Sequence, residues 1–132
     1  MIETGTLSVR VFATQAQIPV EGATVVVTGQ GTQGKARLIS VQATDRSGLI
    51  RPIAIETPAP QESTQPEGMD GGVPFALCTV WAEHPGFAML QVEGVQVFPG
   101  VVTEQDMELN PLAEGEDSLQ RQEIRQMTVQ NL

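Results

Sequence analysis

The fold class of this 132-residue chain is decided by residues 18–27, which read IPVEGATVVV. Pro19 fixes one backbone angle and Gly22 permits the positive φ that a tight turn requires. The residues that follow, 24–27, are all strong strand formers, which favours a strand buried in a core. An alternating apolar run at residues 7–12 precedes the turn. The region therefore predicts a strand, a turn and a second strand.

The same pattern of short strands separated by proline and glycine turns continues along the chain. Turns are predicted at residues 45–48, 85–86 and 99–100. In the first of these, the Asp45 carboxylate is placed to accept backbone hydrogen bonds, and Gly48 takes the left-handed position. Further strands are predicted at residues 23–28, 36–44, 49–55, 75–83, 87–92, 95–98 and 101–109. The chain is thus predicted to be all-β.

Side-chain parity predicts which residues the strands bury. In the strand at residues 75–83, one face carries Phe75, Leu77, Thr79 and Trp81, and the other carries Ala76, Cys78, Val80 and Ala82. In the strand at residues 36–44, we expect Leu38 and Val41 to contact the core. In the strand at residues 101–109, Met107 and Leu109 lie opposite Glu104, Asp106 and Glu108.

Two segments lack this alternation. Residues 57–74 hold four of the nine prolines and predict a long loop that crosses from one sheet to the other. Asn110 and Pro111 end the module, so we predict a β-sandwich domain at residues 1–111 and an acidic linker with a C-terminal tail at 112–132. Within the tail, both a helix from Ser118 to about Gln126 and a strand at residues 127–132 fit the pattern.

Composition excludes several classes of partner. The net charge is −9, from 16 acidic and 7 basic residues, so no basic patch is expected to bind nucleic acid or an anionic membrane. No apolar span approaches the ~20 residues of a transmembrane helix. Residues 1–4 lead directly into a strand, which predicts no signal peptide in this chain. Cys78 is alone, so no disulfide can form within the chain, and we expect it to be buried.

Residue types that carry catalysis or bind metals are sparse. His84 is the single histidine, and six residues of extended strand put it roughly 20 Å from Cys78, which excludes a nucleophile–base pair. Candidate oxygen ligands for calcium are Glu62, Glu67 and Asp70, and also Glu104, Asp106 and Glu108. The second set alternates along one strand, which favours a solvated polar face. We expect no catalytic residue, no cofactor, no metal site and no enzyme activity.

The motifs together resemble the carboxypeptidase regulatory-like domain. They are GTLSVRV at residues 5–11, PVEGATV at 19–25, TDRSG at 44–48, PGF at 85–87, and VQV at 95–97 leading to MEL at 107–109. The resemblance implies a seven-strand Greek-key β-sandwich of the transthyretin-like (prealbumin-like) type, here with a C-terminal extension. The chain departs from the family pattern at Phe75, which replaces a tyrosine, and in its long loop at 57–74. A purine-pathway hydrolase has a similar architecture, but its histidines and its tyrosine-rich signature are absent.

The resemblance also bears on location. Small bacterial versions with a Phe-Pro-Gly turn before the last strand, as at residues 98–100, are most similar to this chain. Such versions occur beside or fused to cell-wall-associated modules. This implies a bacterial cell surface or a spore layer, while the sequence itself names no compartment.

Two functions follow as hypotheses. The first is a non-catalytic structural or interaction module that self-associates or binds a protein partner, because sheet edges accept added strands. In this hypothesis the tail docks on a neighbouring copy through Met127, Val129 and Leu132. The alternative is an accessory domain of a cell-wall enzyme system that binds a glycan or peptidoglycan. Trp81 and Phe87 would then stack on the sugar, although their parity favours core packing for both.

Overall fold

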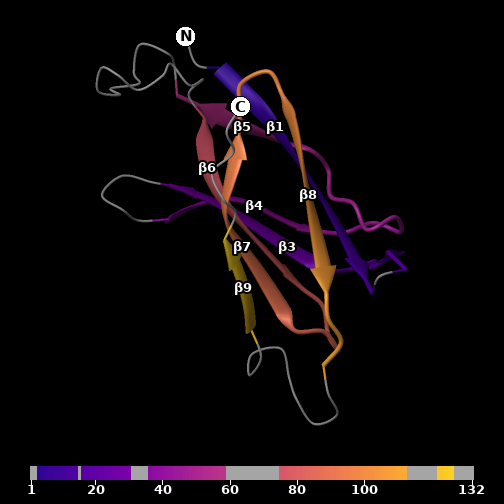
Figure 1. Cartoon of the computed structure of the whole chain (residues 1–132). Helices are drawn as coiled ribbons and strands as arrows, with labels where there is room; N and C mark the ends of the chain where they lie inside the picture. The colour runs from indigo at the N-terminus through magenta and orange to yellow at the C-terminus, as the bar shows by residue number, and fades with distance from the viewer. Residues whose placement is uncertain (1–2, 15, 31–35, 59–74, 113–121, 127–132) are drawn as a thin grey trace.

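The computed structural model describes residues 3–14, 16–30, 36–58, 75–112 and 122–126. Within these ranges the chain is all-β, with nine strands and no helix, and therefore no helix that could cross a membrane. The strands are β1 (Glu3–Ala13), β2 (Ile18–Pro19), β3 (Thr24–Gln30), β4 (Ala36–Ala43), β5 (Ile53–Thr57), β6 (Ala76–Glu83), β7 (Met89–Val97), β8 (Val102–Leu109) and β9 (Gln122–Gln126). They form two sheets packed as a β-sandwich (Figure 1).

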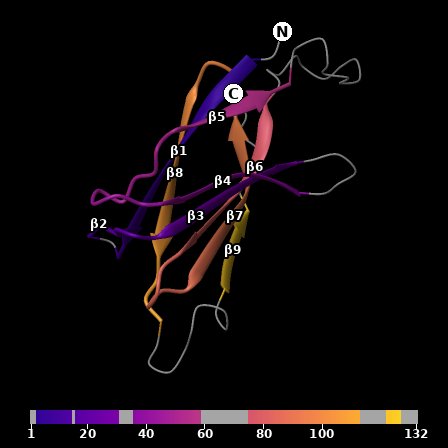
Figure 2. The same ribbon diagram turned by 180° about the vertical axis from the view of Figure 1, so that it is seen from behind.

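The four-stranded sheet, sheet A, is organised around β1. One edge of β1 pairs antiparallel with β5 over its first residues and with β2 at its end. The other edge of β1 pairs with β8 in a parallel register that runs from Thr6↔Val102 to Ala13↔Leu109. The five-stranded sheet, sheet B, has the order β4-β3-β6-β7-β9, with one parallel pair, β7 and β9. Figures 1 and 2, which view the molecule from opposite sides, show the neighbouring strands β1 and β8 crossing over the strands of sheet B.

The core lies between the two sheets, where alternate residues of each strand are removed from solvent. The largest fully buried side chains are Leu7, Leu90, Met107, Leu109, Val9, Val11, Val25, Val27, Val80, Val92, Val95 and Val97. The expected burial of Cys78 is confirmed, and Val80 and Ala82 on the same face of β6 are buried with it. In β8, Met107 and Leu109 are buried on the face opposite the acidic residues, as predicted. Burial of these apolar groups, at roughly 25 cal/mol per Å², is the main stabilising term.

The turn that decides the fold has the predicted backbone, and a distant threonine stabilises it. Gly22 has φ of 80°, the left-handed conformation expected of it. The buried Thr44 hydroxyl accepts a hydrogen bond from the Ala23 N–H at 2.9 Å and donates one to the Val20 carbonyl at 2.6 Å. Thr44 therefore fixes the start of β3 against the end of β4.

The turn at residues 45–48 is also confirmed. The Asp45 carboxylate accepts hydrogen bonds from the backbone N–H of Ser47 at 2.8 Å and of Leu49 at 3.0 Å. Gly48 has φ of 77°, and a Cβ added there would lie 2.3 Å from the Val11 carbonyl oxygen. Glycine is required at this position both by its backbone angle and by its close approach to β1.

The expectation that Leu38 and Val41 contact the core is wrong. Their side chains are 62% and 58% exposed. The register of β4 against β3 shifts from Val27↔Ser40 to Thr28↔Leu38, which leaves Ile39 as the extra residue of a β-bulge. The bulge puts Leu38 and Val41 on one face of sheet B, but that face is the outer one, and Ile39 packs against the core instead.

The two strands predicted at residues 87–92 and 95–98 form one strand, β7. The pairs Cys78↔Val95 and Val80↔Val92 leave Glu93 and Gly94 together opposite the single residue between them on β6. Gly94 has φ of 77°, so it forms a bulge within the strand and does not end it.

The predicted tail contains a strand where a helix was expected. Residues Gln122–Gln126 form β9, parallel to β7, so the helix prediction is wrong for this part. The remainder of that prediction and residues 127–132 lie outside the described residues, and the domain boundary at residue 111 stays a prediction. The segment at residues 57–74 joins β5 of sheet A to β6 of sheet B, as predicted, although residues 59–74 lie outside the described residues.

Candidate functional site

Several predicted site residues lie outside the part of the chain that the structure describes. These are the docking residues Met127, Val129 and Leu132 and the candidate calcium ligands Glu62, Glu67 and Asp70. The site is therefore built from the remaining candidates and from surfaces that the described strands create.

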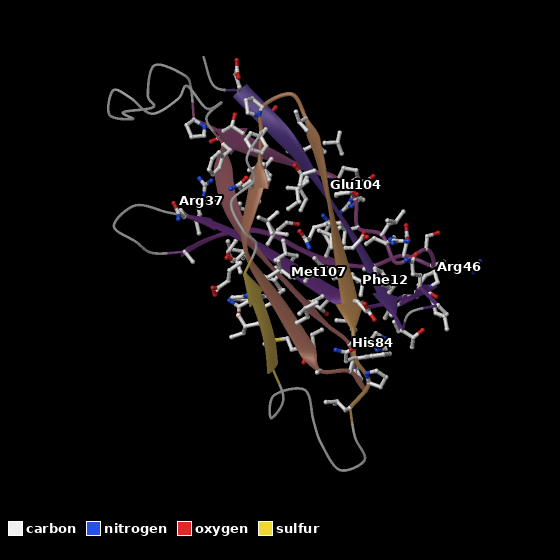
Figure 3. The ribbon with its side chains drawn as sticks, viewed as in Figure 1. Phe12, Arg37, Arg46, His84, Glu104 and Met107 are labelled. Carbon is white, nitrogen blue, oxygen red and sulfur yellow. The ribbon has the colours of Figure 1, made fainter. Side chains whose placement is uncertain are left out.

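Cys78 and His84 are held apart by the length of β6. Cys78 is 2% exposed and faces the sandwich interior. Burial raises the pKa of its thiol to about 11, against a smaller opposing effect of the Arg37 guanidinium. His84, labelled in Figure 3, follows the last residue of β6. Its Nδ1 lies 2.9 Å from the Pro85 carbonyl oxygen, and its ring is edge-on to Phe87. Because its pKa lies far above 7, Cys78 is a protonated core side chain at neutral pH.

The acidic side chains of β8 lie on the outer face of sheet A. Glu104 and Asp106 are exposed (Figure 3 labels Glu104), and Asp106 forms an ion pair with Arg10 at 3.3 Å. The Arg10 guanidinium also lies 4.7 Å from the centre of the Phe12 ring. The predicted solvated polar face is confirmed. Among the described residues, no three carboxylate, imidazole or thiol groups gather closely enough to hold a metal ion.

The two candidate stacking residues differ in their surroundings. Phe87 packs against the core, as parity predicted. Trp81 lies on the outer face of sheet B, because its neighbours in β6, Val80 and Ala82, are fully buried on the inner face. The buried Nε1 atom of Trp81 has no hydrogen-bond acceptor among the described residues. Core packing was therefore the wrong expectation for Trp81.

Trp81 is the centre of a row of side chains that crosses the whole of sheet B. The register pairs Val41 with Val26, Val26 with Trp81, Trp81 with Gln91, and Gln91 with Ile124. We call these five residues, one from each strand, the Trp81 row. Directly paired side chains lie about 5 Å apart, so the row is continuous.

The ends of the Trp81 row are the most exposed. Val41 on the edge strand β4 is 58% exposed and Ile124 on the edge strand β9 is 57% exposed. Leu38 lies in the adjacent row, on the same outer face, opposite Thr28. Single exposed apolar side chains are ordinary, whereas the contiguous apolar set of Val41, Val26 and Trp81, which Gln91 separates from Ile124, is typical of a contact surface. The other large exposed hydrophobic residues of the described chain are Ile18, Leu49, Val101 and Val102, in sheet A or the loops beside it.

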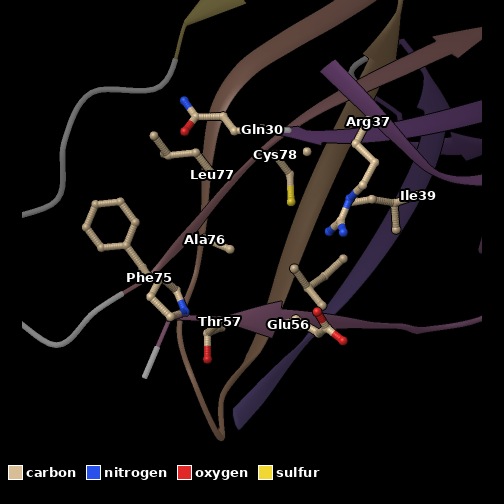
Figure 4. A pocket seen from close by; sticks show the side chains of 12 residues that line it. Gln30, Arg37, Ile39, Glu56, Thr57, Phe75, Ala76, Leu77 and Cys78 are labelled. Carbon is tan, nitrogen blue, oxygen red and sulfur yellow. The ribbon is translucent and has the colours of Figure 1, made fainter. Parts of the chain in front are cut away.

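A pocket of about 390 Å³ opens at one end of the sandwich (Figure 4). It is lined by Gly29, Gln30, Arg37, Ile39, Ile55, Glu56, Thr57, Pro58, Phe75, Ala76, Leu77 and Cys78. Most of these side chains are apolar, and Arg37 is the one cation among them. The Thr57 hydroxyl already donates a hydrogen bond to the Glu3 carbonyl at 3.1 Å. This volume lies within the range of small-molecule sites, roughly 300–1,000 Å³.

Sequence reasoning missed both surfaces. Strict alternation along a strand places Leu38 and Val41 on opposite faces. Only the bulge at Ile39, which the sequence pattern does not reveal, puts Leu38 on the outer face beside Val41. The pocket had one usable signal, Gly29, a glycine inside β3. A Cβ at Gly29 would lie 2.9 Å from Ile39 Cδ1, so the glycine marks a close approach of a neighbouring side chain.

Comparison with known proteins adds little to this geometry. No protein-family model and no curated protein matches the chain. Among solved structures, the chain is similar to a 9R-lipoxygenase from Cyanothece PCC8801, with a TM-score of 0.36 and 11% sequence identity over 83% of this chain. The matched region is only 16% of the lipoxygenase chain, and a likeness of this size supports no argument about function.

Proposed function

We propose that this chain is a non-catalytic, self-assembling interaction module that contacts a second copy of itself through the outer face of sheet B. The Trp81 row is the observation that carries the proposal. It combines a partly buried tryptophan with exposed Val41 and Ile124 on a single face. Burying such side chains against a partner is favourable, and tryptophan is enriched among the residues that dominate binding energy.

The C-terminal segment extends this surface. β9 pairs with the outer edge of β7, so a strand added to this edge brings Ile124 into line with Trp81. In the proposed assembly the segment that follows β9 docks on a neighbouring copy through Met127, Val129 and Leu132. Exchange of an edge strand between copies is a low-cost route to oligomers, which supports this arrangement.

We further infer that the sandwich is the transthyretin-like Greek key of the carboxypeptidase regulatory-like domain. In support, β1 and β3 to β8 account for the strand segments predicted within residues 1–111, with two of them merged in β7. The location that the resemblance implies, a bacterial cell surface or a spore or cell-wall layer, is part of the same proposal.

The emission of Trp81 tests the self-assembly directly, because it is the only tryptophan in the chain. Association through the outer face should move this emission to shorter wavelength as the protein is concentrated. Deletion of residues 118–132 should lower the number of copies in each particle, which light scattering gives as the particle mass divided by the mass of one chain. A chain that stays monomeric at every concentration, with an emission independent of concentration, would contradict the proposal.

A second candidate is the accessory glycan- or peptidoglycan-binding domain. It is favoured by one observation, the place of Trp81 on an outer face beside the polar side chains of Thr79 and Gln91, since sugars stack on indole rings between hydrogen-bonding groups. The test is a titration of dilute protein with cell-wall fragments. Binding at this face should shift the Trp81 emission, and an unchanged emission counts against it.

A further inference from the structure

We propose that the pocket at the end of the sandwich, which Arg37 helps to line, binds a small ligand that has one carboxylate and an apolar group. This site lies between the sheets, whereas the Trp81 row lies on the outside of sheet B. The inference therefore stands independently of the proposed self-assembly.

The interior of the pocket is suited to an apolar group. Ile55 and Cys78 are nearly inaccessible and form part of its wall, with Ile39 and Ala76 packed against the same core. Phe75 and Phe98 have ring centroids 5.3 Å apart, so the Phe75 wall is supported by a second ring. A branched aliphatic group placed here would replace water against apolar surface, at roughly 25 cal/mol per Å².

Arg37 supplies the charge for the carboxylate. The register places Arg37 opposite Gly29, whose missing side chain leaves room for Ile39 beside the guanidinium. Figure 4 shows the guanidinium turned toward the Cys78 thiol, inside the ring of lining residues. Among the described residues, the Arg37 guanidinium has no hydrogen-bond or ion-pair partner, so its planar fork is free to bind a carboxylate in a bidentate manner.

Glu56 does not neutralise this charge. Its neighbours in β5, Ile55 and Thr57, are each 3% exposed and face inward, so Glu56 is on the opposite, exposed face of the strand. No ion pair joins it to Arg37 within the described residues. Because Glu56 lines the pocket, its negative charge disfavours any added carboxylate, and it disfavours a ligand with two carboxylates more than a ligand with one.

Two sources carry this chemistry: a free carboxylic acid, or the C-terminal end of a peptide with an apolar last side chain. The probes are isocaproate for the first and an acetylated Gly-Gly-Leu peptide for the second. Isocaproamide and the amidated peptide are the uncharged controls. Backbone amide chemical shifts of the full chain report where each probe binds.

The expected result is a saturable shift of the Leu77 and Cys78 amides with one or both acids, at millimolar concentration, and much weaker binding of the amides. Arg37→Gln should weaken the acids roughly tenfold or more, because hydrogen bonds to charged groups are the strong ones. Arg51→Gln is the matched control, because it removes the same charge from another exposed arginine, and it should bind as the original chain does.

The outcome decides both the site and the source. Binding of isocaproate assigns the pocket to free acids, and binding of the peptide alone assigns it to a chain end. Three results would overturn the proposal: no shift with either acid, equal binding by the Arg37→Gln and Arg51→Gln variants, or shifts that lie away from the pocket. Because Arg37 is exposed, its replacement should leave the fold intact, and the amide spectrum verifies this directly.

Discussion

Thr44 shows how one buried hydroxyl can stabilise a turn that is distant from it in the sequence. Its side chain bonds to both Val20 and Ala23, and its backbone carbonyl accepts a hydrogen bond from the Gly22 N–H at 3.0 Å. The sequence predicted the turn from Pro19 and Gly22 but gave no reason to connect it to Thr44. Such a connection depends on the pairing of β3 with β4, which is a tertiary property.

Replacing Thr44 with valine should lower the free energy of unfolding by about 2–4 kcal/mol, because two buried backbone groups lose their partner at similar side-chain volume. Urea denaturation measures this. The control is Thr24→Val, at an exposed strand position, which should change stability by about 0.5 kcal/mol or less. Equal stabilities of the two variants would show that the Thr44 hydrogen bonds contribute little.

Gly48 and Gly100 separate two costs of adding a side chain. Both have positive φ, 77° and 73°, but only Gly48 has a backbone oxygen within reach of an added Cβ. Gly48→Ala should therefore cost more than about 2 kcal/mol, whereas Gly100→Ala should cost about 1 kcal/mol, the conformational penalty alone. Thermal unfolding of the two variants checks the difference. Similar midpoints would contradict the close contact between Gly48 and Val11.

Cys78 should make stability depend on pH in the alkaline range. Its pKa rises from 9.0 to about 11 on folding, so the folded state holds the proton more tightly than the unfolded state. This contribution is fully present below pH 9 and is lost as the pH rises through 11, to a limit of about 2–3 kcal/mol. Urea denaturation of the original chain and of Cys78→Ala isolates it. Parallel pH profiles for the two proteins would contradict a buried thiol.

At the scale of elements, the sequence predicted most strands and failed where a strand departs from simple alternation. Turn residues such as Gly22 and Gly48 act locally, so their conformations were predictable. The bulges at Ile39 and Gly94 were not, because a bulge is defined by the partner strand. Each changed the interpretation: the first moved Leu38 to the outer face, and the second joined two predicted strands into β7.

The strand β9 illustrates the same limit. The weak pattern of the tail fitted a helix up to about Gln126 and a strand only at residues 127–132. Residues 122–126 instead form a strand, because the edge of β7 offers unpaired backbone groups. Deleting residues 118–132 should therefore speed amide hydrogen exchange in Met89–Glu93, the part of β7 that pairs with β9. Exchange in β3, which does not pair with β9, should stay unchanged. Unaltered exchange in β7 would contradict the pairing.

At the scale of the whole molecule, the all-β sandwich and the buried thiol followed from the sequence, and the proposed contact surface did not. The sandwich follows from alternation and turn chemistry, which are written in consecutive residues. The Trp81 row collects one residue from each of five strands, and it exists only once all four registers are known. The pocket likewise needs β4, β5 and β6 to meet.

The most direct test of the central claim is sedimentation velocity of two matched charge variants. Leu38 on sheet B and Val102 on sheet A are each 62% exposed, so a lysine at either position should leave the fold intact. If the outer face of sheet B joins two copies, Leu38→Lys should shift the concentrated protein toward the monomer and Val102→Lys should not. Equal effects of the two lysines, or a monomeric original chain, would contradict the claim.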